Sequence, residues 1–415
     1  MTVIDVDLTD RSLYRHGFPH DLFTDLRARG AVLRHPTVVL ERSPQSIDFW
    51  VVLRHAEVQE VSRDAQRFAA RDGPTLTPAL DVQKGEAVVY ADAPMHTRLR
   101  KLIAAGFTPR MIARLDEQVR RRVDAIFDAV VERDGEIDFV RDIAYRLPMQ
   151  IIGDIIGIPE SDRDHVFGIT DVFMRAGDPR SGVSGAERDQ KMFELYQYAT
   201  ALGAEKLANP ADDVWSVLAS AEIDDDDGNR VRLSQFQLDL FFLVLSVAGS
   251  ETTRNAISHG MVTLSERPDD LRALRADPTL WDTATDEVLR WTSPVTDFAR
   301  TATCDTEVGG THIAAGDRVA VFYPSANRDE RAFAEPFRFD VRRSPNHHVS
   351  FGGGGAHYCL GAHLARREIR TLFEQLLARF AGIEITGDIT WTVGGPDQSV
   401  AVSIDRMPVQ LTPAH

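Results

Sequence analysis

The sequence has little cysteine, no long apolar run and no excess of positive charge. Its 415 residues include only two cysteines, Cys304 and Cys359. So few cysteines in so long a chain exclude a disulfide scaffold and suit a reducing compartment. The longest apolar stretch, 238–248, is interrupted by an aspartate and a serine, and it is much shorter than the ~20 apolar residues that span a bilayer. Residues 1–11 lack the pattern of a signal peptide, so we expect a cytoplasmic protein without a membrane span.

The charge balance is acidic, with 63 acidic against 47 basic residues and a formal net charge of −16. A chain of this sign is not expected to bind nucleic acid or an anionic membrane over its whole surface. Apolar residues make up 43% and charged residues 27% of the chain, which is ordinary for a globular protein and excludes a disordered chain or a collagen.

Helical periodicity dominates from Pro94 onward, whereas the N-terminal part mixes helix and strand patterns. In that part we predict helices at 14–30 and 56–67, strands at 31–40 and 48–53 around a Ser43–Pro44 turn, and a long loop at 71–89.

A long helix is predicted from Ser234 to Glu266, with Ser234 as its N-cap and Pro268 closing it. It shows no heptad pattern, so it is expected to run through the centre of a large domain. We find no internal repeat and no linker. The sequence therefore predicts a mainly α protein with smaller β-sheets, organised as one domain over residues 1–415.

The strongest chemical signal is a glycine-rich loop around Cys359, which runs Phe351-Gly-Gly-Gly-Gly-Ala-His357-Tyr-Cys359-Leu-Gly361. Glycines permit positive φ and a close approach of the backbone to a neighbour. The amides of the helix that follows are expected to lower the pKa of the Cys359 thiol. A thiolate can be a nucleophile, a zinc ligand or an axial haem ligand, and a buried structural cysteine is the remaining alternative.

A second signal lies in the middle of the predicted long helix, as Ala248-Gly-Ser-Glu-Thr-Thr253. Glycine, an acid and two hydroxyls contradict their apolar surroundings, and such inconsistencies often mark functional sites. A solvent-exposed polar patch at a kink is the alternative.

A third signal is Glu287-Val-Leu-Arg290 on the next helical segments. An acid and a base three residues apart share one helix face and can pair. Taken alone, this spacing is typical of surface ion pairs, which contribute little to stability.

In this order, the three motifs resemble those of cytochrome P450, the haem-thiolate monooxygenases, and the resemblance covers essentially the whole chain. It implies a triangular, helix-rich haem domain with a long central helix. It also implies haem b as cofactor and insertion of one oxygen atom of O2 into a C–H bond of a hydrophobic substrate.

The resemblance assigns Cys359 as the axial thiolate, which favours O–O cleavage at haem iron. It assigns the propionate contacts to His357, His96, Arg100 and Arg300, because buried carboxylates need charge-assisted donors. The remaining cofactor contacts that it implies are Phe351, Gly355, Gly361, Ala248 and Gly249, the last two leaving room for dioxygen. One extra residue separates Phe351 from Gly355 relative to the commonest spacing in the family.

The resemblance also assigns roles away from the cofactor. Glu251 and Thr252 are implied to deliver protons when dioxygen is split. Glu287 and Arg290 are implied to form a structural pair, and Arg338 is expected to join them in a buried network.

Three stretches, 247–260, 325–330 and the glycine loop with 365–369, resemble an actinobacterial branch that hydroxylates sterol side chains and methyl-branched lipids at or near a terminal carbon. A terpene, a macrolide or another secondary metabolite is the alternative substrate. The residues implied to line the substrate pocket are Leu76, Leu80, Val88, Phe173, Val244, Val247, Ala248, Val295 and Phe298.

No electron-transfer module fits in a chain already filled by a haem domain. The resemblance therefore implies a separate ferredoxin and an NAD(P)H-dependent ferredoxin reductase. We expect a local basic patch for the ferredoxin near the cysteine, formed by Arg110, His363, Arg366, Arg367 and Arg370. Two other hypotheses are a haem-free cysteine nucleophile with His357 or His363 as base, and a non-catalytic carrier that uses the same cavity.

Overall fold

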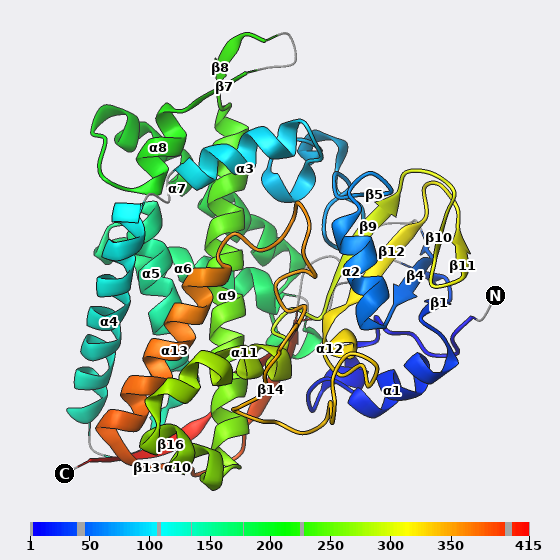
Figure 1. Ribbon diagram of the computed structural model, residues 1–415. Helices are drawn as coiled ribbons and strands as arrows, with labels where there is room; N and C mark the ends of the chain where they lie inside the picture. Colours follow the sequence, from blue (N-terminus) through cyan, green and yellow to red (C-terminus); the bar gives the residue numbers. More distant parts are fainter. Residues whose placement is uncertain are drawn as a thin grey trace.

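The computed structural model describes residues 3–39, 46–105, 109–133, 135–176, 178–224, 228–394 and 401–414, with the side chains of 105, 109–113 and 179 excepted. Helices form one side of the molecule and a mixed sheet with the N-terminus forms the other (Figure 1). In the described residues, no helix is both long enough and apolar enough to cross a membrane.

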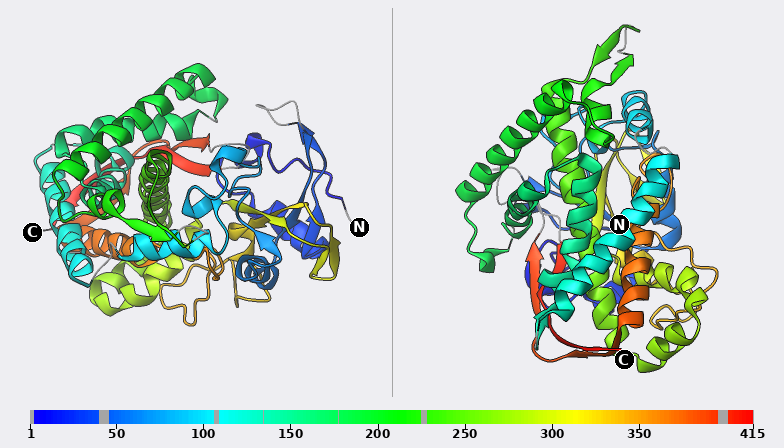
Figure 2. Two further views of the ribbon diagram at one scale, coloured as in Figure 1. Left: turned by 90° about the horizontal axis from the view of Figure 1, so that it is seen from above. Right: turned by 90° about the vertical axis from the view of Figure 1, so that its left-hand side faces the viewer.

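A single long helix, α9 (Gln235–Ser265), runs through the middle of the helical part (Figures 1 and 2). Ser234 begins it through a capping box, since its hydroxyl accepts from the Gln237 amide while the Gln237 side chain accepts from the Ser234 amide. Side chains are buried on all faces of the helix, among them Phe241, Ile257 and Met261. The predicted long central helix is therefore confirmed to within one residue at each end.

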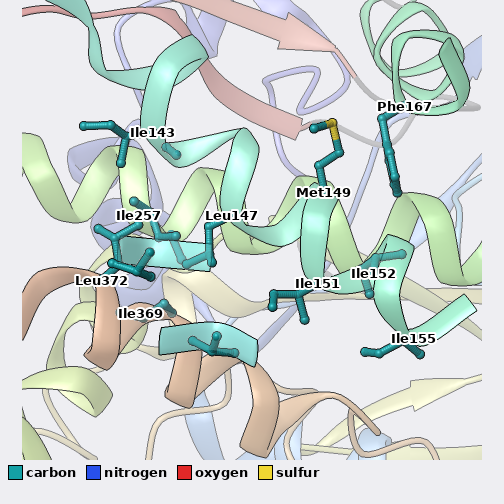
Figure 3. Close-up of a cluster of buried hydrophobic side chains, with 14 of the residues drawn as sticks. Ile143, Leu147, Met149, Ile151, Ile152, Ile155, Phe167, Ile257, Ile369 and Leu372 are labelled. Carbon is teal, nitrogen blue, oxygen red and sulfur yellow. The ribbon is translucent and has the colours of Figure 1, made fainter. Parts of the chain in front are cut away.

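The helices around α9 bury a continuous apolar core. Ile143, Leu147 and Ile151 on one side meet Ile257 of α9 and Leu372 of the last helix on the other (Figure 3). Burial of apolar surface contributes roughly 25 cal/mol per Å², so this core is a main source of stability. The surrounding helices are α3 (Met95–Ala105), α4 (Pro109–Val131), α5 (Arg146–Ile156), α6 (Glu160–Arg175), α7 (Gly185–Ala208), α8 (Val214–Ser220), α10 (Pro268–Ala276), α11 (Trp281–Thr292) and α13 (Ala362–Arg379).

A five-stranded sheet forms the other side, in the order β1 (Val32–Arg34), β4 (Phe49–Val52), β12 (Arg318–Phe322), β9 (Asp297–Ala302) and β5 (Phe68–Ala69). β4 and β12 are parallel, with Val319 opposite Trp50, and the other neighbours are antiparallel. This pairing connects the N-terminal segment to residues almost 270 positions later. Helices α1 (His20–Arg29), α2 (His55–Arg63) and α12 (Tyr323–Ala326) pack beside the sheet.

Smaller sheets complete the fold. They are β13 (Phe380–Ile385) with β16 (Pro408–Pro413) and β6 (Ile137–Asp138), and the pairs β14 (Thr390–Gly394) with β15 (Ala401–Arg406), β10 (Thr306–Val308) with β11 (Thr311–Ile313), β7 (Glu222–Asp224) with β8 (Arg230–Arg232), and β2 (Val38–Val39) with β3 (Ser46–Ile47). The β7–β8 hairpin projects from the body of the molecule (Figure 1). The mainly α architecture with small sheets agrees with the prediction.

Several predicted boundaries in the N-terminal part differ from the structure. The helix expected at 14–30 begins only at His20, because Gly17 adopts a φ of 106° and Pro19 stands at the N-cap. The helix expected at 56–67 ends at Arg63, where the Asp64 carboxylate accepts from the Gln66 and Arg67 amides in a turn. The loop expected at 71–89 contains two short 3₁₀ turns, η2 (Asp81–Gln83) and η3 (Val88–Tyr90). The predicted Ser43–Pro44 turn lies outside the described residues.

Candidate active site

The glycine-rich loop packs its backbone directly against the end of α2. Gly352 to Gly355 all have positive φ values. A Cβ atom on Gly355 would lie 2.5 Å from the carbonyl oxygen of Ser62, a contact with backbone that no side-chain motion could relieve. The glycines are thus explained by a close approach to α2, and the loop that leads to Cys359 is fixed in place.

The loop closes through a hydrogen bond at its two ends. The Cys359 amide donates to the Phe351 carbonyl over 3.0 Å. The Phe351 ring packs beside Tyr358, and the Arg366 guanidinium lies 4.6 Å from the centroid of the same ring. The additional glycine between Phe351 and Gly355 is therefore accommodated while the two ends of the loop remain joined.

Cys359 is exposed as a residue, yet desolvation raises the pKa of its thiol and outweighs the lowering by the Gly361 amide, Arg100 and Arg366. The predicted lowering by an amide at the start of the helix is therefore present, but it is not the largest effect. A metal ion at the sulfur would favour the thiolate, because a coordinated thiol is deprotonated outright.

Basic side chains from three separate elements gather near this loop. His96 of α3 is 3% exposed and Arg300 of β9 is 7% exposed. The ring of His96 lies 4.1 Å from the ring of His357, and Arg100 donates to the Tyr358 carbonyl over 2.6 Å. The structure thus brings together the four residues that the sequence predicted for the propionates.

Among the described residues, this basic cluster is only partly balanced by negative charge, which Asp92 supplies to His96 and Arg300. The Nε2 atom of His96 is buried and has no hydrogen-bond partner among the described residues. Burial, Arg300, His96 and Arg100 lower the pKa of His357 to about 3, and burial lowers the pKa of Arg300. The nearby Asp92 carboxylate accepts from the amides of Ala70 and Arg71. Buried cations are unfavourable unless paired, so this cluster fits a ligand that carries carboxylates, as the haem propionates would.

The residues in the polar centre of α9, 248–253, differ in what they contact. The Thr252 hydroxyl donates to the Ala248 carbonyl over 2.8 Å and stays half-buried. A Cβ atom on Gly249 would lie 2.1 Å from Cδ1 of Ile152 in α5. Gly249 therefore allows α9 to pack closely against α5, and its expected role of leaving room for dioxygen stays a prediction.

The Glu251 carboxylate belongs to a buried network that connects three elements. It accepts from Arg254 over 2.5 Å and from the Ser403 hydroxyl over 3.2 Å, while Arg254 also contacts Asp171 of α6 over 3.1 Å. Burial raises the pKa of Glu251, and Arg254 opposes that shift. The sequence analysis missed Arg254 and Asp171, although the spacing of Glu251 and Arg254 was a usable signal for a helix pair.

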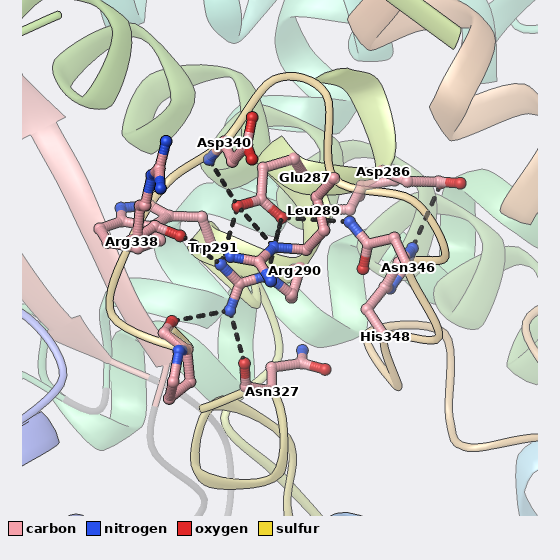
Figure 4. Close-up of polar contacts among 12 residues, drawn as sticks. Asp286, Glu287, Leu289, Arg290, Trp291, Asn327, Arg338, Asp340, Asn346 and His348 are labelled. Carbon is pink, nitrogen blue, oxygen red and sulfur yellow. Dashed lines mark hydrogen bonds and ion pairs between the residues drawn. The ribbon is translucent and has the colours of Figure 1, made fainter. Parts of the chain in front are cut away.

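Glu287 and Arg290 form a fully buried ion pair with no exposed side-chain surface (Figure 4). The Glu287 carboxylate accepts two hydrogen bonds from Arg290, over 2.7 and 2.8 Å, and further ones from Arg343 and Asn346. Arg290 in turn donates to the carbonyls of Asn327, Pro336 and Arg338.

The prediction that the Arg338 side chain joins this network is wrong. Its guanidinium contacts Glu335 at the surface, and only its backbone carbonyl reaches Arg290. Arg343 takes the expected position, 3.1 Å from Glu287. The chain turns between the two arginines and directs the second one inward, which the sequence pattern did not reveal.

The predicted substrate-lining residues divide between the core and the surface. Leu76 is 3% exposed and packs with Phe49 and Ala299 in the core beneath the sheet. The Ala299 amide donates to the carbonyl of Pro74, two residues before Leu76, over 2.7 Å, which attaches this part of the loop to β9. Leu80 is 69% exposed beside η2. The pocket assignment is therefore wrong for both leucines. The half-buried candidates are Val88, Phe173, Val244, Val247, Val295 and Phe298, and Ala248 is exposed.

A cysteine loop at a helix start, beside a buried basic cluster that is only partly balanced by negative charge, defines the class of haem-thiolate proteins. The model of the family described as "Cytochrome P450" matches residues 188–389. Cytochrome P450 126 of Mycobacterium tuberculosis is 43% identical and aligns over 93% of this chain and 94% of that protein. The chain belongs to the cytochrome P450 family. It is a monooxygenase with haem b as its cofactor.

Other relatives of this chain have more specific names. The methyl-branched lipid omega-hydroxylase of M. tuberculosis is 40% identical, over 88% of this chain and 85% of that protein. The steroid C26-monooxygenase of Mycolicibacterium smegmatis is 39% identical, over 79% and 76%. The solved structure of Mycobacterium marinum cytochrome P450 CYP268A2 in complex with pseudoionone has a TM-score of 0.89 and 36% identity, and the match covers 99% of both chains. Because the chain belongs to this family of monooxygenases, the hypotheses of a haem-free cysteine nucleophile and of a non-catalytic carrier are set aside.

We predict that Glu287→Gln lowers the free energy of unfolding by about 3–5 kcal/mol, because it leaves the buried guanidinium of Arg290 without its negative partner. Arg338→Ala is the matched control, since it removes only an exposed ion pair that contributes less than about 1 kcal/mol. Chemical denaturation followed by circular dichroism measures both. Equal losses in the two variants would contradict this assignment of the network.

Proposed function

We propose that this monooxygenase hydroxylates an apolar substrate at or near a terminal carbon, with a sterol side chain or a methyl-branched lipid as the substrate class. The observation that carries the proposal is the 40% identity to a methyl-branched lipid omega-hydroxylase over 88% of the chain, supported by the relative named as a steroid C26-monooxygenase. The half-buried apolar candidates Phe173, Val244 and Val295 suit such a substrate.

A terpene or another secondary metabolite is the alternative substrate. The solved relative in complex with pseudoionone, an isoprenoid ketone, favours it. Both classes present branched hydrocarbon to the enzyme, and they differ in whether the oxidised carbon is at the end of a long chain. Product analysis separates them.

We propose that Cys359 is the thiolate ligand of the haem iron and that His96, Arg100, Arg300 and His357 hold the two propionates. When bound, the haem supplies the activation of dioxygen. The four basic groups offer charge-assisted donors to two carboxylates, in a site where the nearby Asp92 carboxylate already accepts from the amides of Ala70 and Arg71. We further propose that Phe351, Gly355 and Gly361 shape the loop around the sulfur and that Ala248 presents a small side chain to the site.

We propose that Glu251 and Thr252 deliver protons to the reaction. The raised pKa of Glu251 lets its carboxyl group hold a proton in a buried position. The ion pair with Arg254 holds the Glu251 carboxyl group beside α9. Glu251 directly precedes Thr252 in the sequence. The Thr252 hydroxyl donates its hydrogen to the Ala248 carbonyl, so its oxygen lone pairs are available to orient a water molecule.

We propose that electrons come from a separate ferredoxin with its NAD(P)H-dependent reductase, which docks near the start of α13. Arg366, Arg367 and Arg370 lie on this helix, as expected. Each is paired with an acid: Asp286 at 2.6 Å, Asp116 at 3.0 Å, and Asp282 together with Glu374. The local net charge is therefore smaller than the sequence predicted. His363 is exposed, and the side chain of Arg110 lies outside the described residues.

We infer that residues 1–415 form one haem domain that works in the cytoplasm. Both cysteines are free thiols, which suits a reducing compartment. The alignment of solved and curated relatives over nearly the whole chain supports one structural unit.

The substrate proposal predicts which ligands change the haem spin state. We expect a sterol with an intact side chain, or a methyl-branched fatty acid, to give a saturable spectral shift and a terminally hydroxylated product by mass spectrometry. Cys359→Ser, which lacks the thiolate ligand, is the negative control for the shift. Turnover of pseudoionone or a macrolide, with no oxidation of either lipid class, would favour the alternative.

We predict that Thr252→Ala uncouples the enzyme, so that NAD(P)H is consumed while hydrogen peroxide replaces product. Loss of a positioned proton donor typically costs about 10²-fold or more in the step it serves. The matched control is Thr253→Ala, which removes the neighbouring buried hydroxyl. The ratio of product to NAD(P)H consumed is the measurement, and tight coupling in Thr252→Ala would refute the role.

The ferredoxin proposal predicts an effect of charge reversal on α13. Arg367→Glu and Arg370→Glu are expected to raise the KM for ferredoxin about tenfold at low salt and to flatten its salt dependence, because steering by complementary charge is screened by ions. Arg230→Glu, on the projecting β7–β8 hairpin, is the control. An unchanged KM and salt dependence in both α13 variants would count against this docking surface.

A further inference from the structure

A cavity of about 250 Å³ lies between the N-terminal segment, the second half of α9, the end of α11 and the β14–β15 pair. His20, His259, Thr292 and Arg328 are among the residues that line it. None of the residues proposed above to hold the haem, deliver protons or contact substrate lines this cavity. It is therefore a separate feature that the monooxygenase reaction does not explain.

Four polar atoms on residues that line the cavity are buried and have no hydrogen-bond partner among the described residues. They are Nδ1 of His20, Nε2 of His259, Oγ1 of Thr292 and Nε of Arg328. Buried polar groups in folded proteins are nearly always paired, and each unpaired one is costly. Four such atoms around one cavity point to a bound molecule that supplies the partners.

The charge around the cavity favours an anion. Arg328 is 1% exposed, and its two terminal nitrogens donate to the carbonyls of Arg290 and Trp291 rather than to an acid. None of the described side chains that line the cavity is acidic. Burial and the guanidinium groups of Arg328, Arg27 and Arg290 lower the pKa of His20 to about 3, which reports a positive environment. A carboxylate placed here would compensate a buried positive charge.

The walls of the cavity favour a flat ring. Phe18, Trp291, Phe337 and Trp391 line it. The His259 ring meets Trp391 edge-on at 5.3 Å, and the His20 ring meets Phe337 edge-on at 6.1 Å. Aromatic side chains prefer such offset or edge contacts with further rings. The volume is below the roughly 300–1,000 Å³ of pockets for drug-sized ligands, so the ligand has one or two rings.

We propose that this cavity is a second binding site, which takes a small aromatic carboxylate. The acid lies in the positive field of Arg328 and accepts hydrogen bonds from His20 and Thr292, while the ring packs between the tryptophans. The ligand also contacts the segment 291–296, which leads into β9 and its Phe298. The proposal is independent of which lipid the enzyme oxidises.

The test uses the haem-loaded enzyme with 2-naphthoate as the probe. The iron is first saturated with 4-phenylimidazole, so that the probe cannot report binding at the haem. Equilibrium dialysis is expected to show one saturable site per chain. The neutral isostere 2-naphthamide is expected to bind about tenfold more weakly, because it lacks the charge-assisted contact. Absence of saturable binding, or equal affinity for the amide, would overturn the proposal.

Variants connect the binding to this cavity. Val262→Trp fills the cavity from α9 and is expected to abolish binding, while Val231→Trp on the exposed hairpin is the control. His20→Phe keeps the ring but removes both nitrogens, and it is expected to weaken binding about threefold or more without filling the cavity. The carbon monoxide spectrum and the thermal midpoint verify that each variant is folded. Unchanged affinity in both cavity variants would place the probe elsewhere and refute the site.

Discussion

The position of the cysteine loop depends on the ion pairs and hydrogen bonds of one buried carboxylate, that of Glu287. It pairs with Arg290 and Arg343 and accepts from Asn346, so one carboxylate on α11 connects segments that lie 56 and 59 residues later. Arg290 extends the connection to the carbonyl of Asn327. The Asn327 side chain then bonds Ser350 and the amide of Val349, immediately before Phe351. A buried ion pair contributes little net stability when intact, but here its geometry determines where the cysteine loop begins.

The residues proposed to hold the haem differ from this network, because their charges are not fully balanced within the protein. His96 and Arg300 are buried with Asp92 as the nearby negative charge, and Cys359 is an exposed free cysteine whose thiol pKa is raised by desolvation. The protein alone leaves the basic side chains only partly balanced and the protonated form of the thiol favoured. A cofactor that carries two carboxylates and a metal ion relieves both at once, so the binding free energy of the haem contributes to the stability of the folded chain.

The sequence was sufficient for the regular and chemically distinctive parts of this molecule. Ser234 as the N-cap and Pro268 after the last turn specified α9 almost to the residue. The family resemblance, rather than the spacing alone, identified Glu287 and Arg290 as a structural pair. Prediction failed where the path of the backbone decides whether a side chain is buried or exposed. Leu76 and Leu80 have similar side chains, yet Leu76 lies in the core, near the point where the loop is attached to β9, and Leu80 remains in solvent. Arg343 replaced the Arg338 side chain because the backbone turns between them. The close contact of Gly249 with α5 was also not predictable, since sequence does not reveal the position of Ile152.

The central helix α9 contains polar groups of both kinds, some with a partner in the protein and some without. It is surrounded largely by apolar side chains, so each buried polar side chain on it needs a partner from the protein or from a ligand. Within the protein the Glu251 carboxylate accepts from Arg254 and Ser403, and the Asn255 amide nitrogen donates to Ser403, while Nε of Arg254 and Oδ1 of Asn255 have no partner among the described residues. Two turns later, the Nε2 atom of His259 has no such partner. The same helix therefore contains one polar group satisfied by the fold and another that the described residues leave unsatisfied. The Glu251 carboxylate, for which we propose proton delivery, is thus paired by the protein itself, whereas His259 faces the second cavity, where we propose a ligand.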